Sequence, residues 1–126
     1  MKFITAALAL TASMALAPMA HAQSASAALA RLFADERAAV YRADPTSATY
    51  AGVHNYDDRL PSVTPQTQAA QLAADRGFVQ RLYAIDRTAL SAQEQVSYDL
   101  FDFMVGERVR FAPYNEWRMP FNSDSG

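Results

Sequence analysis

The chain of 126 residues contains no cysteine, and this absence excludes several kinds of site at once. Without cysteine there is no disulfide bond, no thiolate ligand for a metal and no cysteine nucleophile. A lipid anchor attached to an amino-terminal cysteine is excluded for the same reason. The stability of the folded part must therefore come from packing and hydrogen bonds.

Lysine and histidine are almost as scarce. The one lysine is Lys2. The residues after residue 22 include ten arginines and thirteen acidic residues, which give a net charge of −3 with histidine neutral. Both signs are interspersed and no basic stripe is present, so the sequence predicts no nucleic-acid partner. His54 is the one histidine after residue 22, and a single histidine cannot build the H-E-x-x-H helix of a zinc peptidase.

Glycine occurs four times and never in a phosphate-binding loop, and no serine stands in a Gly-x-Ser-x-Gly elbow. Three carboxylates, those of Asp99, Asp102 and Glu107, lie near one another in the last helical pattern. For general acid–base catalysis, burial or a close charged neighbour would have to shift the pKa of one of these groups. We predict instead a solvated helix face that Arg108 partly neutralises.

What the chain does have begins with an export signal. Lys2 and the amino-terminal amine precede an apolar run over residues 4–17, and Ala20 and Ala22 then place small residues at the −3 and −1 positions before Gln23. This pattern predicts a secretory signal peptide in the first 22 residues, cleaved after Ala22, and not an uncleaved anchor or a buried helix. The run is too short for a bilayer, which needs about 20 apolar residues. We expect a periplasmic or secreted protein without membrane contact after cleavage.

The remaining 104 residues, 23–126, have the size of one small domain. Apolar residues at helical spacing predict three amphipathic helices, over residues 26–43, 64–85 and 91–109. The buried side of the first helix is expected to consist of Leu29, Leu32, Phe33, Val40 and Tyr41. That of the second is expected to consist of Ala69, Leu72, Val79, Leu82 and Tyr83, and that of the third of Val96, Leu100, Phe103 and Met104. Glu36 interrupts the first stripe. No segment shows the period of a strand, so the fold class is all-α.

Capping residues define the predicted helix ends. Asp44 caps a short helix over residues 45–51, which Gly52 stops, and Thr64 caps the second long helix. Ser91 and Glu94 form the capping box of the third. After residue 111 the helical pattern is lost, and an irregular carboxyl-terminal tail is expected.

One loop collects the polar side chains that are candidates for a site. The segment HNYDDRLP, residues 54–61, has no periodicity and contains His54, Asp57, Asp58 and Arg59. These side chains are the candidates for an acid–base or hard-metal cluster. We favour a structural reading, in which the two aspartates bond loop amides and pair with Arg59 to fix the turn.

Short motifs over residues 28–126 carry a family resemblance. Their order is DPTSATYAG at 44–52, HNYDDRLP at 54–61, AID at 84–86, LS at 90–91, YDLF at 98–101 and RMPFN at 118–122. In this order and spacing the chain resembles the amino-terminal region of a bacterial family catalogued as domain of unknown function 885. The resemblance implies an exported α-helical zinc metallopeptidase of the gluzincin type, several times longer than this chain.

The zinc-binding helix that the resemblance implies lies far downstream of the matched region. No catalytic, metal or cofactor residue of the family can therefore be placed on this chain. Zinc and a peptide substrate are implied for the full-length protein alone, in which the first helices would flank the substrate cleft by analogy.

The turn-rich ending leaves Trp117, Met119 and Phe121 with little chain to cover them. We therefore expect residues 23–126 to be the amino-terminal helical part of a truncated larger domain, non-catalytic by itself and lacking its downstream helices. The alternative is a small, complete periplasmic helical protein that acts as a binding or interaction module.

Overall fold

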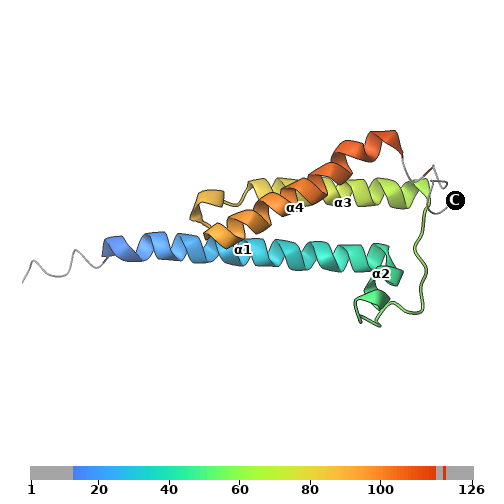
Figure 1. Ribbon diagram of the computed structural model, residues 1–126, viewed down its shortest axis with the longest axis horizontal. Coiled ribbons are helices and arrows are strands. Elements are labelled where there is room, and N and C mark those ends of the chain that lie inside the picture. The colour runs from blue at the N-terminus through green and yellow to red at the C-terminus, as the bar shows by residue number, and fades with distance from the viewer. Residues whose placement is uncertain (1–12, 116–117, 119–126) are drawn as a thin grey trace, which may run out of the picture.

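The computed structural model describes residues 13–115 and Arg118, with side chains from residue 19 onward. The elements in chain order are α1 (Ser13–Ala43), α2 (Pro45–Tyr50), α3 (Pro65–Tyr83), the 3-10 turn η1 (Arg87–Ala89), α4 (Ala92–Phe111) and the 3-10 turn η2 (Ala112–Tyr114). The described residues contain no strand, which confirms the all-α class. Helix α3 runs antiparallel to α1. Helix α4 crosses α3 and runs in the same direction as α1 (Figure 1).

The predicted caps of the last three helices are confirmed. The Asp44 carboxylate accepts hydrogen bonds from the Thr46 and Ser47 amides at the start of α2, and Thr64 Oγ1 accepts one from the Thr67 amide in α3. Ser91 and Glu94 form both bonds of the capping box of α4. Because a cap depends on residues within one helical turn, the sequence defines these helix starts locally.

Helix α1 is longer than predicted. It begins at Ser13 and not at Ser26, and it passes through Ala20, Ala22 and Gln23 without a break. Residues 13–25 are rich in alanine, with leucine and methionine, which have the highest helix propensities, and the helix continues through Pro18. The helix therefore extends toward the amino terminus, beyond the residues that pack in the core. None of the described helices is both long and apolar enough to cross a membrane.

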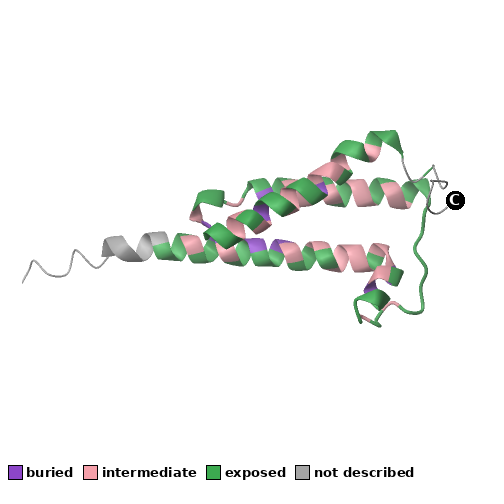
Figure 2. Cartoon of the chain, in the orientation of Figure 1, coloured by how far each residue is buried: buried purple, intermediate pink, exposed green. Residues whose placement is uncertain are grey.

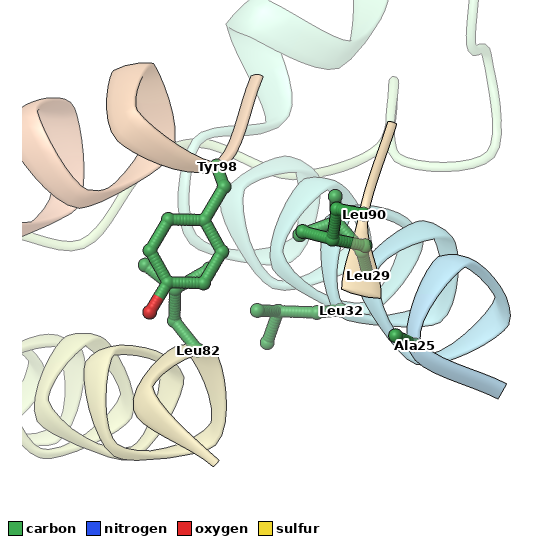
Figure 3. Close-up of a cluster of buried hydrophobic side chains, with 6 residues drawn as sticks. All are labelled: Ala25, Leu29, Leu32, Leu82, Leu90 and Tyr98. Atoms are coloured by element: carbon green, nitrogen blue, oxygen red, sulfur yellow. The ribbon is translucent and has the colours of Figure 1, made fainter. Parts of the chain in front are cut away.

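The core lies toward the end of the bundle where α3 joins α4. It consists of Ala25, Leu29, Leu32, Leu82, Leu90 and Tyr98, which gather from three helices and the connecting turn (Figure 3). The rings of Phe33 and Phe101 extend it, with centroids 5.0 Å apart. Figure 2 shows that burial is confined to short stretches of the chain. The small core leaves much of each helix surface uncovered.

The prediction for the buried side of α4 is wrong. Val96, Leu100, Phe103 and Met104 are more than half exposed, whereas Tyr98 and Val105 on the opposite side are buried. Helix α4 is apolar on both sides, so periodicity alone cannot choose the face that packs. Ala69 and Tyr83 of α3, expected inside, are also exposed.

Candidate functional site

The His54 loop brings together three side chains that the sequence separates. Asp57 accepts a hydrogen bond from Thr49 Oγ1 at 2.6 Å, and its other oxygen lies 2.8 Å from Nδ1 of His54. The bond from Thr49, and then that from His54, lower the pKa of Asp57. The expected bonds to loop amides are replaced by these side-chain bonds, so Asp57 ties α2 to the loop.

The other two candidates of the loop form a separate pair. Arg59 Nε lies 3.4 Å from Asp58 Oδ1, as the sequence predicts, and the Arg59 guanidinium lies 5.8 Å from the centroid of the Tyr56 ring. Both charged side chains are more than 60% exposed, so the pair contributes little to stability.

Chemically, the loop presents an imidazole oriented by a carboxylate. A hydrogen bond from Nδ1 to Asp57 fixes the ring and leaves Nε2 as the free nitrogen, the arrangement of general bases and of histidine metal ligands. The His54 side chain is 68% exposed, so the ring faces solvent. Within residues 13–115 and Arg118, no three His, Asp or Glu side chains come together as a metal site would require.

The three candidate carboxylates of α4, those of Asp99, Asp102 and Glu107, are each held by a different partner. Asp99 makes two hydrogen bonds with the Arg87 guanidinium, Asp102 accepts one from the Tyr83 hydroxyl, and Glu107 pairs with Arg110. The bond to Arg87 lowers the pKa of Asp99. The bond to Asp102 raises the pKa of Tyr83.

The predicted partner of these carboxylates, Arg108, pairs elsewhere. Its Nη2 lies 2.7 Å from Glu36 Oε1 in α1 and 2.9 Å from Asp75 Oδ1 in α3. Burial opposes the charged form of Arg108, but the bonds to Asp75 and Glu36 outweigh it and raise the pKa. This ion-pair network joins all three long helices, and sequence reasoning missed it. The available signal was Glu36, since a carboxylate in an apolar stripe needs a cation.

A groove of about 510 Å³ lies beside the network, between the first half of α3 and the end of α4. Apolar groups of Ala69 and Leu72 in α3 and of Phe111 and Ala112 at the end of α4 line it, and Asp75 and Arg108 also contribute. Its volume is in the range of small-ligand pockets. No pattern in the sequence indicates this groove, because it depends on how two helices cross.

The cleavage-site residues lie in α1. Ala20 and Gln23 are exposed, whereas Ala22 is half-buried and Ala25, three residues later, is part of the core. Between the two alanines, Nε2 of His21 lies 3.0 Å from Asp86 Oδ2 in the connection between α3 and α4. This contact between residues 65 positions apart was also missed, and cleavage after Ala22 stays a prediction.

Over residues 13–115 and Arg118, the fold is all-α, and its three long helices meet at one small core and one ion-pair network. Within that class, the chain belongs to the family described as "Bacterial protein of unknown function (DUF885)", whose sequence model matches residues 45–124. The match includes α2, the His54 loop, α3 and α4, which confirms the predicted family. It starts at residue 45, whereas the resemblance was expected from residue 28. Comparisons with curated proteins and with solved structures found no match.

Proposed function

We propose that this chain forms the amino-terminal, non-catalytic part of a larger exported helical protein, in which it packs against further helices. The observation that carries the proposal is the outer face of α4, defined here as Val96, Leu100, Phe103 and Met104. Each of these side chains is between 54% and 66% exposed. They follow one another at intervals of four, three and one residues, which places them on one side of the helix.

The opposite side of α4 packs against the rest of the bundle. Tyr98 and Val105 are 8% and 1% exposed, and the Phe101 ring contacts that of Phe33. Apolar side chains thus lie on two opposite sides of α4, with charged residues such as Asp99 and Asp102 between them. Contiguous exposed apolar patches on soluble proteins mark interaction sites. The outer face therefore favours a role as one layer of a larger helical structure.

The family resemblance indicates what kind of protein the larger one is. It implies a zinc metallopeptidase whose metal and peptide substrate are held by residues outside this chain. The His54–Asp57 pair supports no more than a single imidazole contact. We therefore assign this chain a supporting role beside such a catalytic part, with export to the periplasm or the medium.

The size of the exported protein tests the proposal. An antibody raised against residues 23–126 should detect, in the exported fraction of cells that carry the gene, a protein several times heavier than the 13.8 kDa of this chain. Sequencing of the DNA beyond the Gly126 codon should give an in-frame continuation with a His-Glu-x-x-His-like helix. A single band of about the mass of residues 23–126 would instead favour the small binding module.

A surface variant tests the outer face of α4 directly. Leu100→Gln with Phe103→Gln should lower hydrophobic-dye binding and self-association of the purified chain while its helical circular dichroism is kept. The matched control is Tyr50→Gln with Leu60→Gln, two substitutions at exposed apolar residues outside α4. Equal effects of the two double variants would contradict a specific role of α4.

A further inference from the structure

A smaller hollow lies between α1 and α3 and adjoins the groove between α3 and α4 at Asp75 and Arg108. Its volume is about 240 Å³, which is below the range of about 300–1,000 Å³ typical of pockets that hold a whole drug-sized ligand. This α1–α3 hollow therefore has room for one small chemical group, such as a single side chain.

The walls of the α1–α3 hollow are mostly apolar. Val40 and Ala43 line it from α1, and Ala74 and Phe78 line it from α3. An aliphatic chain packs well against such walls, because it leaves no polar group without a partner. Long basic side chains and alkylamines combine an aliphatic chain of this kind with a charged end.

The charged groups at the hollow have an excess of negative charge. Asp44, Asp75 and Arg108 line it, and Arg108 is already bonded to Asp75 and to Glu36. These four groups carry a net charge of −2. Hydrogen bonds from the start of α2, that of the Ser47 hydroxyl above all, lower the pKa of Asp44, so this carboxylate is ionised at neutral pH. A cleft with apolar walls and charges mostly of one sign concentrates ions of the opposite sign, so the hollow favours a cation.

The side chain of Gln71 adds a polar group that is not yet used. Gln71 is half-buried and lines the hollow, and its side-chain amide makes no hydrogen bond with another residue that the structure describes. The amide oxygen can therefore accept a hydrogen bond from a group inside the hollow. Guanidinium and ammonium groups only donate hydrogen bonds, so they match both this oxygen and the carboxylates.

We propose that the α1–α3 hollow binds one organic cation with an aliphatic stem, an alkylguanidinium or alkylammonium group. Its charged end lies beside the Asp44 and Asp75 carboxylates, and its stem packs along Ala43 and Ala74. This is the chemistry of an arginine or lysine side chain and also of a free alkylamine. The site does not include the outer face of α4, so it is independent of the function proposed above.

A titration of the full chain followed by NMR tests the site. The probe is n-butylguanidinium, and its matched control is n-butylurea, which has nearly the same shape and no charge. With the cation, the amide shifts of residues 39–44 and 71–75 should move and saturate. The affinity should be about ten times that for n-butylurea, since hydrogen bonds between ionised groups are the strong ones. Equal affinities for the two probes, or no saturation with the cation, would overturn the proposal.

Two substitutions locate the bound cation. Ala74→Leu should fill the hollow and remove the saturable shifts, whereas Ala73→Leu, at an exposed neighbour that does not line it, should not. Asp44→Asn removes a charge but keeps a good helix cap, and it should weaken binding severalfold. Asp58→Asn, at a carboxylate that is 75% exposed in the His54 loop, is its control. Unchanged affinity in either Ala74→Leu or Asp44→Asn would show that the cation binds elsewhere.

A third probe separates the two sources of the cation. A blocked tripeptide with arginine between two alanines carries the same guanidinium on a polypeptide. Tighter binding of this peptide than of n-butylguanidinium would assign the hollow to a basic side chain, and tighter binding of n-butylguanidinium would assign it to a free small cation. Both results support the site, and binding of neither probe overturns it. Circular dichroism checks that each variant keeps its helices, and the comparison with n-butylurea needs no variant.

Discussion

The Arg108 guanidinium in α4 lies 2.7 Å from the Glu36 carboxylate in α1, although the two residues are 72 positions apart in the chain. This contact explains why a glutamate interrupts the apolar stripe of α1. The Glu36 side chain is 17% exposed, as is that of Asp75, the second partner of Arg108. One cation thus pairs with two largely buried carboxylates where three helices meet, and the network keeps a net charge of −1.

Removing that cation should destabilise the fold. Arg108→Ala leaves Glu36 and Asp75 buried and close to each other without a counter-charge, and we expect a loss of about 1–3 kcal/mol in the free energy of unfolding. The 40% exposure of the Arg108 side chain keeps the loss below that of a fully buried pair. Urea denaturation measures it. Arg110→Ala is the control, with an expected change within about 0.5 kcal/mol, and equal losses in the two variants would contradict the network.

The cap of α4 gives a second stability prediction. Ser91→Ala removes the side-chain bond to the Glu94 amide and should cost about 0.5–2 kcal/mol in thermal or urea unfolding. Ser97→Ala is the matched control, because the Ser97 hydroxyl bonds the Gln93 carbonyl inside the helix and caps nothing. A loss for Ser97 as large as that for Ser91 would argue against the capping role.

These two cases show how much the sequence could predict. The caps at Asp44, Thr64 and Ser91 depend on neighbours within one turn, so they could be identified from short patterns, as could the all-α class and the loop after Gly52. The partner of Arg108 depends on which faces of three helices meet. The same limit applies to α4, whose apolar residues on both sides gave no preference for one face.

The candidate loop was predictable in its membership but not in its bonds. The four candidates form two separate pairs, His54 with Asp57 and Arg59 with Asp58, and only the second pair was expected. The bond from Asp57 to Thr49 crosses from the loop to α2, and no local pattern indicates it. The groove between α3 and α4 and the contact of His21 with Asp86 depend on helix packing in the same way.

Acid should destabilise the fold, in part through Asp86. The Thr88 hydroxyl, and then the His21 ring, lower the pKa of Asp86 to about 2. A carboxyl group whose pKa is lower in the folded state stabilises the fold above its unfolded pKa, about 3.9, and this stability is lost as the pH falls toward 2. The urea midpoint should therefore fall between pH 4 and pH 2, and less steeply in Asp86→Asn.

Thr88→Val separates the two causes of this shift. It should raise the pKa of Asp86 toward the ordinary value in an NMR titration, because the strongest hydrogen bond to the carboxylate is lost. His21 precedes the predicted cleavage point, so in a chain that starts at Gln23 the bonds from Thr88 should account for most of the lowered pKa of Asp86. A pKa that does not respond to Thr88→Val would show that another group sets it.

The chain from Gln23 onward should bind no zinc stoichiometrically and should hydrolyse no peptide. One histidine without a second nitrogen or sulfur ligand is too little for a zinc site. Metal analysis after dialysis, beside a peptidase assay with added zinc, measures both properties. A zinc ion held by each chain and lost on His54→Ala would make the His54–Asp57 pair a metal site, with Asn55→Ala as the control in the same loop.

The leader should be removed between Ala22 and Gln23. Small side chains at Ala20 and Ala22 fit the requirements of signal peptidase, and a bulky residue would not. Mass spectrometry of the exported protein should find Gln23 as the amino terminus. Ala22→Leu should block processing, whereas Ala27→Leu, on the exposed side of α1 beyond the cleavage point, should not. Intact Met1 on exported wild-type protein would contradict the prediction.

The length of α1 gives this cleavage a geometric consequence. As it stands, α1 has 31 residues and projects well past the end of the bundle (Figure 1), while α3 and α4 have 19 and 20. A chain that starts at Gln23 would keep 21 residues of α1, which brings the three helices to nearly equal lengths of about 30 Å. Removal of the leader would thus make the bundle even at that end, with Ala25 of the core in the first turn.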